Sequence, residues 1–475
     1  MKIHFIGING SGISGVACIA KNKGHDVDGC DIKVDGDYTK QLLKNNIKIE
    51  CGHKVEHLND KDLVVITPAL LYNKQYEKIN EAKFAMDTMP TIKWQKFLGD
   101  YITKKQNVVV ISGTHGKTTT TTLTALMLEN DDKDPTVMVG GEVKEWKQNY
   151  RVGNSNWYVL EGDEYDGNFL NYSPRYLLIN NLEMEHPECF NGFDDYFNNF
   201  KNLIKKIQKN GKIVFNYDDE NIVNLINETM DIITKNKIKL TAYTFENAKH
   251  LKTTNKSRKN EKIDNDIKIY FVEKGNHLIK IDGEIFEYNL IGEHNIKNIT
   301  SATITSMECG VRVSAIKKTL KNFNGAKRRL DRIFKDDRTE IYDDYAHHHT
   351  QVEITIQALK NILEKNEKII AILEPHLISR ITQNTKEYAK ALHLSDYPII
   401  TKVYKSREAF MSDVDVKKII NDEKIEYIED FDDVIERVFK ILKEDDKSKF
   451  KILVMGAGHS YKLTEKIANF INNKT

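Results

Sequence analysis

A glycine- and threonine-rich turn constrains this chain more than any other feature. The stretch "ISGTHGKTTTTT" runs from Ile111 to Thr122 and directly follows three valines. A glycine-rich turn between a strand and a helix lets backbone N–H groups converge on an anion, while a lysine adds a cation and a threonine hydroxyl can bind magnesium. The positive N-terminal end of the helix favours the same anion. The sequence therefore predicts a phosphate-binding loop within an α/β segment.

The spacing inside this turn differs from that of a standard P-loop. Two residues separate Gly113 from Gly116, whereas four separate the corresponding glycines of the P-loop pattern. An ordinary strand-to-helix turn is the alternative interpretation, but the order of strand, turn and helix favours phosphate binding. The residues predicted to bind the nucleotide phosphates are Gly113, Thr114, Gly116, Lys117, Thr118 and Thr119.

Length and charge limit the classes of protein that this chain can belong to. A chain of 475 residues is too long for one ordinary core, and about 150 residues per domain gives about three domains. Lysine and arginine number 71 and aspartate and glutamate 70, so the net charge of +1 provides no field to attract nucleic acid or a membrane. We therefore expect small-molecule partners, with no nucleic acid and no membrane.

The N-terminus and the cysteines indicate a reducing compartment. Met1 leads directly into an apolar strand, and no apolar run is long enough to cross a bilayer, so we expect a cytoplasmic protein without a signal peptide. The five cysteines, Cys18, Cys30, Cys51, Cys189 and Cys309, include no CxxC pair. We expect them to be reduced packing residues, with neither a disulfide framework nor a structural zinc site.

The first segment, residues 1–104, resembles a dinucleotide-type β-α-β unit. A strand at Ile3–Ile6 leads into a glycine turn, a helix and a second strand that ends near Asp31. Gly7, Gly10 and Gly12 permit a close backbone approach to a diphosphate, and Asp31 is either a ligand of a ribose or base or a plain surface residue. The same glycines also suit an NAD-dependent oxidoreductase, which is an alternative class.

The second segment, residues 105–323, carries two further strands that end in polar residues. They lie in "WYVLEGDEYDGNF" and "YLLINNLEMEHPECF". At the carboxyl edge of an open sheet, Glu164 and His186 would face Lys117 and Thr118 across one crevice. A threonine hydroxyl and one carboxylate suffice for Mg²⁺, although a solvated acidic turn is the simpler alternative. Residues 246–290 read as an exposed loop, "TTNKSRKNEKIDND", and a small meander of hairpins without chemistry.

The third segment, residues 324–475, repeats the pattern of strands followed by polar or glycine residues. Its motifs are "FNGAKRRLD", "EIYDDYAHHHTQVEITI", "KIIAILEPHLISR" and "FKILVMGAGHS". Arginine offers a bidentate fork to phosphate, so the basic triplet is either a phosphate ligand or a surface cluster. His376 and Arg380 suit recognition of an anion or a carboxylate.

The order of these motifs resembles the Mur ligases, which are ATP-dependent amide-bond-forming enzymes of cell-wall precursor synthesis. The matching stretches are "GTHGKTTTT", "EGDEYDGNF", "NNLEMEH", "GEHNIKNITSA", "AKRRLD", "YDDYAHHHT", "EPHLISR" and "MGAGH". The resemblance implies an α/β fold of three domains. These are a Rossmann-like UDP-binding domain (1–104), a central P-loop ATPase domain (105–323) and a Rossmann-like amino-acid-binding domain (324–475).

The resemblance also implies a reaction. We expect ATP-dependent joining of L-alanine to the carboxylate of UDP-N-acetylmuramic acid through an acyl phosphate, with release of ADP and phosphate. Joining of the tripeptide L-alanyl-γ-D-glutamyl-meso-diaminopimelate is the alternative, because "EGDEYD" and "NNLE" are more similar to the recycling branch of the family. A degenerate ATP-binding regulator is a third possibility. The expected cofactors are ATP and Mg²⁺, and the expected state is a monomer or homodimer.

The family's site residues transfer to matching positions of this chain. The resemblance implies that Lys117 stabilises the transferred phosphoryl group and that Arg329 reaches the γ-phosphate. It implies metal ligands at Thr118, Glu164 and His186, of which His186 is also catalytic, and an adenosine contact at Asn295. For UDP it implies Gly7, Gly10, Ser11, Gly12 and Asp31, and for the amino acid Asp344, His348, His376 and Arg380, with Asp344 and His348 also catalytic. The chain departs from the family at His349, where proline is usual, and at His459, where aspartate is common.

Overall fold

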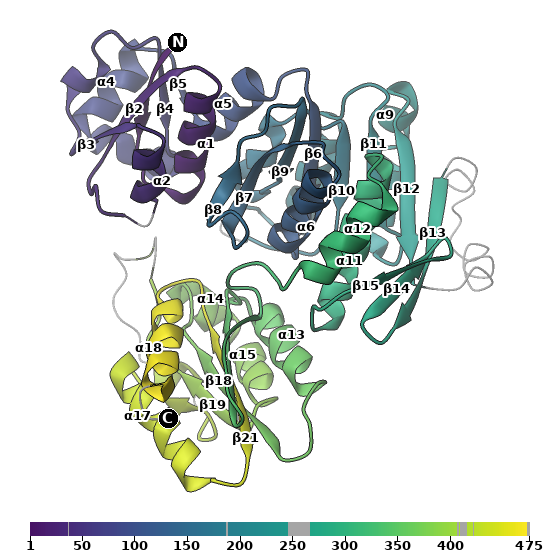
Figure 1. Cartoon of the computed structure of the whole chain (residues 1–475). Helices are drawn as coiled ribbons and strands as arrows, with labels where there is room; N and C mark the ends of the chain where they lie inside the picture. Colours follow the sequence, from purple (N-terminus) through teal and green to yellow (C-terminus); the bar gives the residue numbers. More distant parts are fainter. Residues whose placement is uncertain are drawn as a thin grey trace. The chain divides into compact units, whose positions relative to one another are not determined.

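The strands of this chain form three separate sheets (Figure 1). The computed structural model describes residues 1–36, 38–186, 189–245, 267–405, 408, 416–420 and 422–472. It divides into two compact units, residues 1–289 with 297–323 and residues 290–296 with 324–475. The first unit holds two of the sheets and the second unit holds the third. The predicted three-domain α/β architecture is confirmed.

The first sheet is parallel, in the order β3-β2-β1-β4-β5. Its strands are β1 (Lys2–Ile6), β2 (Asp26–Asp31), β3 (Lys48–Cys51), β4 (Leu63–Ile66) and β5 (Thr91–Lys93). The helical segments are α1 (Ser11–Asn22), α2 (Thr39–Lys44), η1 (Val55–Leu58), α3 (Pro68–Leu71), η2 (Tyr72–Lys78), α4 (Asn80–Thr88), α5 (Trp94–Phe97) and η3 (Leu98–Ile102). Because strand side chains alternate, Ile3 and Phe5 pack in the cluster that includes α1, while Ile6 packs on the opposite face with α4. The predicted β-α-β unit is confirmed.

The second sheet has the order β15-β14-β13-β12-β11-β10-β6-β9-β7-β8. Its strands are β6 (Asn107–Ser112), β7 (Thr136–Val143), β8 (Gln148–Arg151), β9 (Trp157–Glu161), β10 (Tyr176–Ile179), β11 (Lys212–Asn216), β12 (Lys239–Thr244), β13 (Ile267–Gly275), β14 (Leu278–Ile281) and β15 (Glu284–Glu287). The helical segments are α6 (Lys117–Asn130), η4 (Tyr165–Asn171), α7 (Phe193–Ile204), α8 (Glu220–Glu228), α9 (Met230–Lys235), α11 (Glu293–Glu308) and α12 (Val313–Asn322). The antiparallel pairs β13–β14 and β14–β15 confirm the predicted hairpins, while residues 253–266 lie outside the described part.

The threonine run forms a helix that is buried rather than solvated. Residues 118–122 are all threonine and all nearly inaccessible to solvent. The Thr122 hydroxyl donates to the Thr118 carbonyl at 2.8 Å, and the Thr124 hydroxyl donates to the Thr120 carbonyl at 2.8 Å. These bonds back to the preceding turn satisfy the buried hydroxyls of Thr122 and Thr124, whereas the buried Thr121 hydroxyl has no hydrogen-bond partner.

The third sheet is doubly wound, in the order β16-β17-β21-β18-β19-β20. Its strands are β16 (Asp331–Lys335), β17 (Thr339–Asp344), β18 (Glu367–Leu373), β19 (Tyr397–Ile400), β20 (Glu426–Tyr427) and β21 (Lys449–Met455). Helices α13 (His349–Lys360), α14 (Ile378–Gln383), α15 (Thr385–Leu392) and α16 (Val416–Ile420) contribute to one apolar cluster, and α17 (Phe431–Glu444) and α18 (Ser460–Asn472) to the other (Figure 1). Strand β16 runs antiparallel to β17, and the other described strand pairs of this sheet are parallel.

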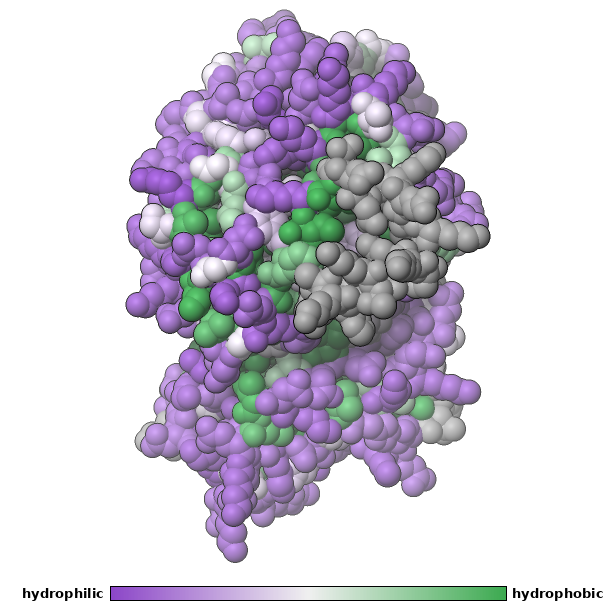
Figure 2. All heavy atoms as spheres, turned by 90° about the vertical axis from the view of Figure 1, so that its right-hand side faces the viewer, coloured by the Kyte–Doolittle hydropathy of each residue, from purple (hydrophilic) through white to green (hydrophobic). Residues whose placement is uncertain are grey.

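The surface and the cysteines qualify two expectations. On the face shown in Figure 2, most of the surface is hydrophilic and apolar side chains are exposed in small groups, which is the usual mixture for a protein surface. Among the described helices, none has the length and apolar character needed to cross a membrane. Cys18, Cys30 and Cys309 are buried as predicted, but Cys51 is exposed, so the packing prediction is wrong for that residue.

Candidate active-site residues

Three loops of the second sheet begin at the same level of its carboxyl edge. Strand β6 lies between β10 and β9, with Ser112 in register with Ile179 and Ile111 in register with Glu161. The loop after β6 contains the Gly–Lys–Thr turn, and the loops after β9 and β10 contain the predicted carboxylate and histidine. The predicted adjacency of these strands is confirmed.

Gly116 allows the phosphate loop to pack closely against its neighbours. Its φ is +81°, a left-handed conformation that favours glycine. A Cβ atom at this position would lie 2.0 Å from Oδ1 of Asn298 in α11. Any larger residue would therefore strain the backbone and displace the loop.

Lys117 folds back over the loop that precedes it. Its Nζ donates to the Gly113 carbonyl at 2.7 Å, to the Thr114 carbonyl at 3.0 Å and to Oε1 of Glu164 at 2.9 Å. Burial disfavours the charged form of the ammonium, but nearby carboxylates, Glu164 first among them, raise its pKa above the usual value. The structure therefore keeps a cation at the mouth of the loop.

The Thr118 hydroxyl contacts a carboxylate that sequence reasoning did not assign to the site. It donates to Oε1 of Glu161 at 3.0 Å, and the other oxygen of Glu161 accepts from the Gly140 N–H at 2.7 Å. Glu161 is the last residue of β9, in register with Ile111, and its place directly after an apolar run was a sequence signal that it shares with Glu164. Glu164, predicted as the carboxylate beside Thr118, pairs with the lysine instead.

Glu164 joins Lys117 to His186. Its carboxylate is fully buried, and its Oε1 lies 3.8 Å from Nε2 of His186. The second oxygen, Oε2, is buried without a hydrogen-bond partner. His186 has a φ of +57° and its ring lies edge-on to that of Tyr165, with centroids 5.1 Å apart. The structure thus brings the predicted lysine, glutamate and histidine together.

The donor set fits a magnesium ion. A buried carboxylate oxygen without a donor suits a neighbouring cation, and Mg²⁺ prefers oxygen ligands such as the Thr118 hydroxyl and the carboxylates of Glu161 and Glu164. His186 offers nitrogen, which is a poorer ligand for Mg²⁺.

Two asparagines after β10 hold the phosphate loop in place. Oδ1 of Asn181 accepts from the His115 N–H at 2.7 Å, and its Nδ2 donates to the His115 carbonyl at 3.0 Å. Nδ2 of Asn180 donates to the Thr120 hydroxyl at 3.0 Å. Sequence reasoning included these residues in a motif but assigned them no role.

The two remaining loop threonines are enclosed. The Thr114 hydroxyl donates to the Glu183 carbonyl at 2.8 Å and accepts from the Glu183 N–H at 3.0 Å, so it positions the loop. Thr119 lies in the first turn of α6 and is 5% exposed.

The glycine loop of the first sheet joins β1 to α1. Gly7 and Gly10 form its turn, with the Gly10 N–H donating to the Gly7 carbonyl at 3.2 Å. A Cβ atom on Gly12 would lie 2.4 Å from the Trp94 ring. Gly12 is therefore required for the packing of α1 against α5, whatever it binds.

Asp31 and Ser11 support the same loop. Oδ2 of Asp31 accepts from the Asn9 N–H at 2.9 Å, and the Ser11 carbonyl accepts from Nδ2 of Asn149 in β8 at 2.7 Å. These bonds tie the loop to the end of β2 and to the second sheet.

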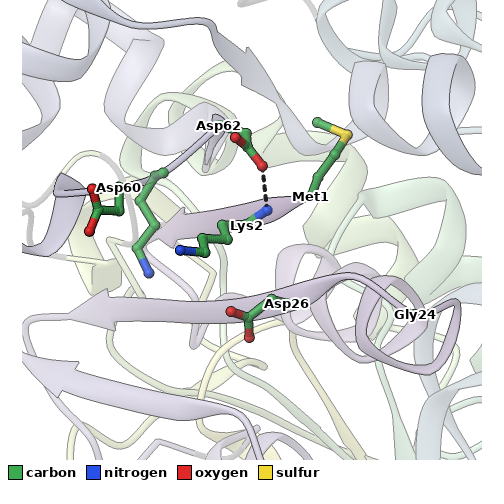
Figure 3. Close-up of a pocket in the computed structure, with 7 residues that line it drawn as sticks. Met1, Lys2, Gly24, Asp26, Asp60 and Asp62 are labelled. Carbon is green, nitrogen blue, oxygen red and sulfur yellow. Dashed lines mark hydrogen bonds between the residues drawn. The ribbon is translucent and has the colours of Figure 1, made fainter.

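A shallow pocket of the first sheet lies away from these loops (Figure 3). It is lined by Met1, Lys2, Gly24, Asp26, Asp60, Lys61 and Asp62. These residues begin β1 and β2 or precede β4, so the pocket is at the amino edge of the parallel sheet, whereas ligands of open α/β sheets bind at the carboxyl edge. We exclude it from the candidate active site.

In the second compact unit, three central strands end at one level. Asp344 of β17 and Leu373 of β18 are both in register with Met455 of β21. The loops that follow carry the predicted residues of the third segment, so the sheet brings His347, His376 and Gly456 to one edge.

Asp344 holds the backbone around this edge. Its two carboxylate oxygens accept from the N–H groups of Leu330, at 2.6 Å, and Ala346, at 2.7 Å. The side chain is 6% exposed. Asp344 therefore fixes the backbone on both sides of the end of β17, including the residue that follows the two arginines.

The two arginines before β16 differ in their contacts. Nη2 of Arg328 donates to the Gly456 carbonyl at 2.6 Å and the Ser460 hydroxyl at 3.0 Å, and its Nε lies 3.3 Å from Oδ2 of Asp343. The Arg329 guanidinium lies over the Tyr345 ring, 5.1 Å from its centroid. Arg328 thus ties segments of the fold together.

Histidines gather beside a buried arginine. The rings of His347 and His376 are 5.2 Å apart, and Arg380 is 7% exposed. Burial, then the positive charge of Arg380, holds the pKa of His347 well below its usual range, so this ring is neutral. His348 is the N-cap of α13, and its N–H and that of His347 point to Oε1 of Gln351 at 3.5 and 3.2 Å.

Three other predicted positions have local explanations. Nδ2 of Asn295 donates to the Ile291 carbonyl at 2.8 Å in the first turn of α11. His349 is the first residue of α13, a position that proline also suits. The His459 ring lies 5.1 Å from that of Tyr404, just before α18.

Asp343 provides a test of the electrostatics at this edge. Burial raises its pKa to about 7, with Arg328 opposing the shift and Asp344 and Asp331 adding to it. The folded state then binds more protons than the unfolded state between about pH 4 and pH 7, so stability falls as the pH rises through this window. We expect the thermal midpoint of Asp343→Asn, relative to the native protein, to be higher at about pH 8 than at about pH 5.

Differential scanning calorimetry at both pH values measures this difference. The control is Asp337→Asn, at an exposed position in the turn between β16 and β17. It should show no such change. A midpoint difference for Asp343→Asn that is the same at both pH values would contradict the assignment.

Three α/β sheets, one of which carries a Gly–Lys–Thr phosphate loop, define a multidomain ATP-dependent enzyme. Models of the Mur ligase family match the chain in order: its catalytic domain at residues 2–105, its middle domain at 111–306 and its glutamate ligase domain at 328–458. The chain belongs to the Mur ligase family and is an ATP-dependent, amide-bond-forming ligase. The oxidoreductase interpretation of the first glycine loop is therefore wrong.

Individual relatives cover nearly the whole chain. UDP-N-acetylmuramate–L-alanine ligases from Dictyoglomus turgidum and Caldicellulosiruptor bescii are 34% and 32% identical, with 98% and 96% of this chain and 96% of each relative aligned. The crystal structure of UDP-N-acetylmuramate-alanine ligase from Thermotoga maritima, 24% identical, superimposes with a TM-score of 0.76 and coverage of 100% of both chains. That structure supports the fold.

Proposed function

We propose that this chain joins L-alanine to the carboxylate of UDP-N-acetylmuramic acid, with cleavage of ATP to ADP and phosphate, in peptidoglycan precursor synthesis. The observation that carries the proposal is the near-complete alignment with two relatives that have this activity in their names. The buried Lys117–Glu164 ion pair beside the phosphate loop supports the proposal, because it holds a cation where charge on a transferred phosphoryl group would need one.

The reaction must bring together two anions, the substrate carboxylate and the triphosphate. A carboxylate oxygen attacks the γ-phosphorus and ADP leaves, which gives an acyl phosphate. The amine of L-alanine then attacks the acyl carbon, and phosphate leaves as the amide forms and a proton is lost. Lys117 remains protonated in its buried site and balances the charge on the transferred phosphoryl group.

The cation site beside Lys117 completes this arrangement. Thr118, Glu161 and Glu164 would hold Mg²⁺, with His186 beside them, and the bound ion would neutralise charge on the phosphate oxygens. The asparagines after β10 keep the loop N–H groups in one orientation, so little reorganisation is needed when the phosphates bind.

We assign the remaining substrates by segment. Residues 1–104 bind the UDP-sugar through the Gly7–Gly12 turn, with Asp31 supporting it. Residues 105–323 bind ATP, with Asn295 at the adenosine. Residues 324–475 supply Arg329 for the γ-phosphate and His348, His376 and Arg380 for the amino acid, with Asp344 holding the arginine turn. We place the enzyme in the cytoplasm, as a monomer or homodimer.

Phosphate release and product mass test the function together. The purified protein, with ATP, Mg²⁺ and UDP-N-acetylmuramic acid, is supplied with L-alanine, glycine, L-serine or the tripeptide L-alanyl-γ-D-glutamyl-meso-diaminopimelate. We expect the fastest release with L-alanine and a product heavier by one alanyl residue. Release with the tripeptide alone would assign the chain to the recycling branch instead.

A further inference from the structure

A second cluster of chemically active side chains lies in the first sheet, on the face opposite α1. Strands β1 and β2 are in register, and the alternation of their side chains places His4 and Cys30 on this face. Segment η1 adds His57, and the first turn of α4 adds Glu81. One potential ligand atom from each of these four residues, which we call the His–Cys–Glu cluster, lies within 4.8 Å of every other.

The Glu81 carboxylate is the centre of the cluster. It is 0% exposed, with Oε1 2.9 Å from Nδ1 of His57 and 3.1 Å from Nε2 of His4. Its Oε2 accepts from the Cys30 thiol at 3.0 Å and lies 3.1 Å from Nδ1 of His53. A carboxylate removed from water in this way requires a compensating cation or a full set of donors.

His4 directs a nitrogen atom into the cluster without a hydrogen bond. The side chain is 1% exposed, and its Nε2 lies 3.1 Å from Oε1 of Glu81 without meeting the geometry of a hydrogen bond. The other ring nitrogen, Nδ1, lies 2.7 Å from Oδ1 of Asp28, which is itself paired with the Lys61 ammonium. A carboxylate on the far nitrogen is the arrangement that orients metal-binding histidines.

The donor set distinguishes among metals. Imidazole, thiolate and carboxylate together suit Zn²⁺ in a tetrahedral site, whereas Mg²⁺ and Ca²⁺ prefer oxygen alone. Zn²⁺ balances the charge of Glu81 and of a Cys30 thiolate, with one proton released from the thiol on binding. The four proposed ligands come from separate elements. The absence of a CxxC pair in the sequence therefore does not exclude a zinc site of this kind.

We propose that His4, Cys30, His57 and Glu81 bind one Zn²⁺ ion, with Asp28 as the outer partner of His4. The ion links β1, β2, η1 and α4, so it stabilises the first sheet on the face opposite α1. The site lies beside the glycine turn, because the Cys30 carbonyl accepts from the Gly7 N–H at 2.9 Å, but its existence does not depend on the proposed substrates. The competing explanation is a metal-free hydrogen-bonded cluster.

Metal content and cobalt spectroscopy test the site in the full-length, untagged protein. We expect about one Zn²⁺ per chain after dialysis against zinc-free buffer that contains excess Mg²⁺, which would occupy the oxygen-rich site beside Lys117. Exchange into Co²⁺ should produce a near-ultraviolet thiolate-to-cobalt band and intense visible bands of tetrahedral cobalt. Zn²⁺ should also raise the thermal midpoint of the metal-free protein.

Two variants and a control assign the ligands. Cys30→Ser should abolish the thiolate-to-cobalt band, and Asp28→Asn should weaken metal binding about 10- to 100-fold. Cys51→Ser, in which the thiol removed is exposed, should keep both the band and the affinity. The proposal would be overturned by a zinc content far below one ion per chain, or by the absence of a thiolate-to-cobalt band in the native protein. It would also be overturned by a band that survives in Cys30→Ser. The first two outcomes are measured on the native protein, so they decide the question even if Cys30→Ser folds poorly.

Discussion

Lys117→Met is expected to lower the rate of ATP-dependent phosphate release by about 1,000-fold. Methionine keeps most of the alkyl chain but removes the ammonium that contacts the loop carbonyls and Glu164. The charge that develops on the transferred phosphoryl group then has no cation at this position. Single-turnover release of phosphate from ATP, with UDP-N-acetylmuramic acid and L-alanine present, measures the effect.

Stability must be separated from catalysis in this variant. Removing Lys117 leaves Glu164 buried without its cation, at a cost of about 3–5 kcal/mol. The double variant Lys117→Met/Glu164→Gln removes both charges, so we expect recovery of the thermal midpoint without recovery of activity. Lys133→Met is the matched control, because Lys133 also pairs with a carboxylate, Asp131, but beyond the far end of α6. A double variant that regained the rate would disprove the phosphate role.

The edge of the second sheet was predictable because it depends on strand position alone. Each apolar run is followed at once by polar residues, and parallel strands in register deliver their loops to one edge. Ser112, Ile179 and Glu161 end their strands within one register position of each other. That is sufficient to bring Lys117, Glu164 and His186 together.

The choice between neighbouring carboxylates was not predictable. Glu161 and Glu164 both follow the same buried strand, and the turn between them decides which one meets Thr118. That turn continues into Asp166 and Gly167, which have φ values of +50° and +61°. Residue types alone do not determine the backbone path of such a turn. The sequence therefore predicted an acidic residue beside Thr118 but could not decide between Glu161 and Glu164.

Clusters assembled from distant elements are hidden from the sequence for a different reason. His4, Cys30, His57 and Glu81 share no spacing pattern, and each alone reads as a core or surface residue. The contacts of Asp344 are hidden in the same way, because its two carboxylate oxygens accept from backbone N–H groups of different segments. Spacing patterns in a sequence reveal sites formed by one loop, whereas the His–Cys–Glu cluster and the contacts of Asp344 each join several elements.

Arg329→Ala is expected to lower the rate of ATP-dependent ligation by about 100- to 1,000-fold while lowering the thermal midpoint less than Arg328→Ala does. Some loss of stability is expected, because burial raises the pKa of the Asp344 carboxyl and the positive charge of Arg329 opposes that shift by favouring the ionised form. Its guanidinium has a stacking contact with Tyr345, and we propose that its function is to bind the γ-phosphate. Arg328→Ala is expected to lower the midpoint instead, because Arg328 ties Gly456 and Ser460 to Asp343. Measuring both quantities for both variants separates the roles of two arginines that are adjacent in sequence. If Arg329→Ala kept most of its rate, or lost it only in proportion to unfolding, the phosphate role would belong to another residue.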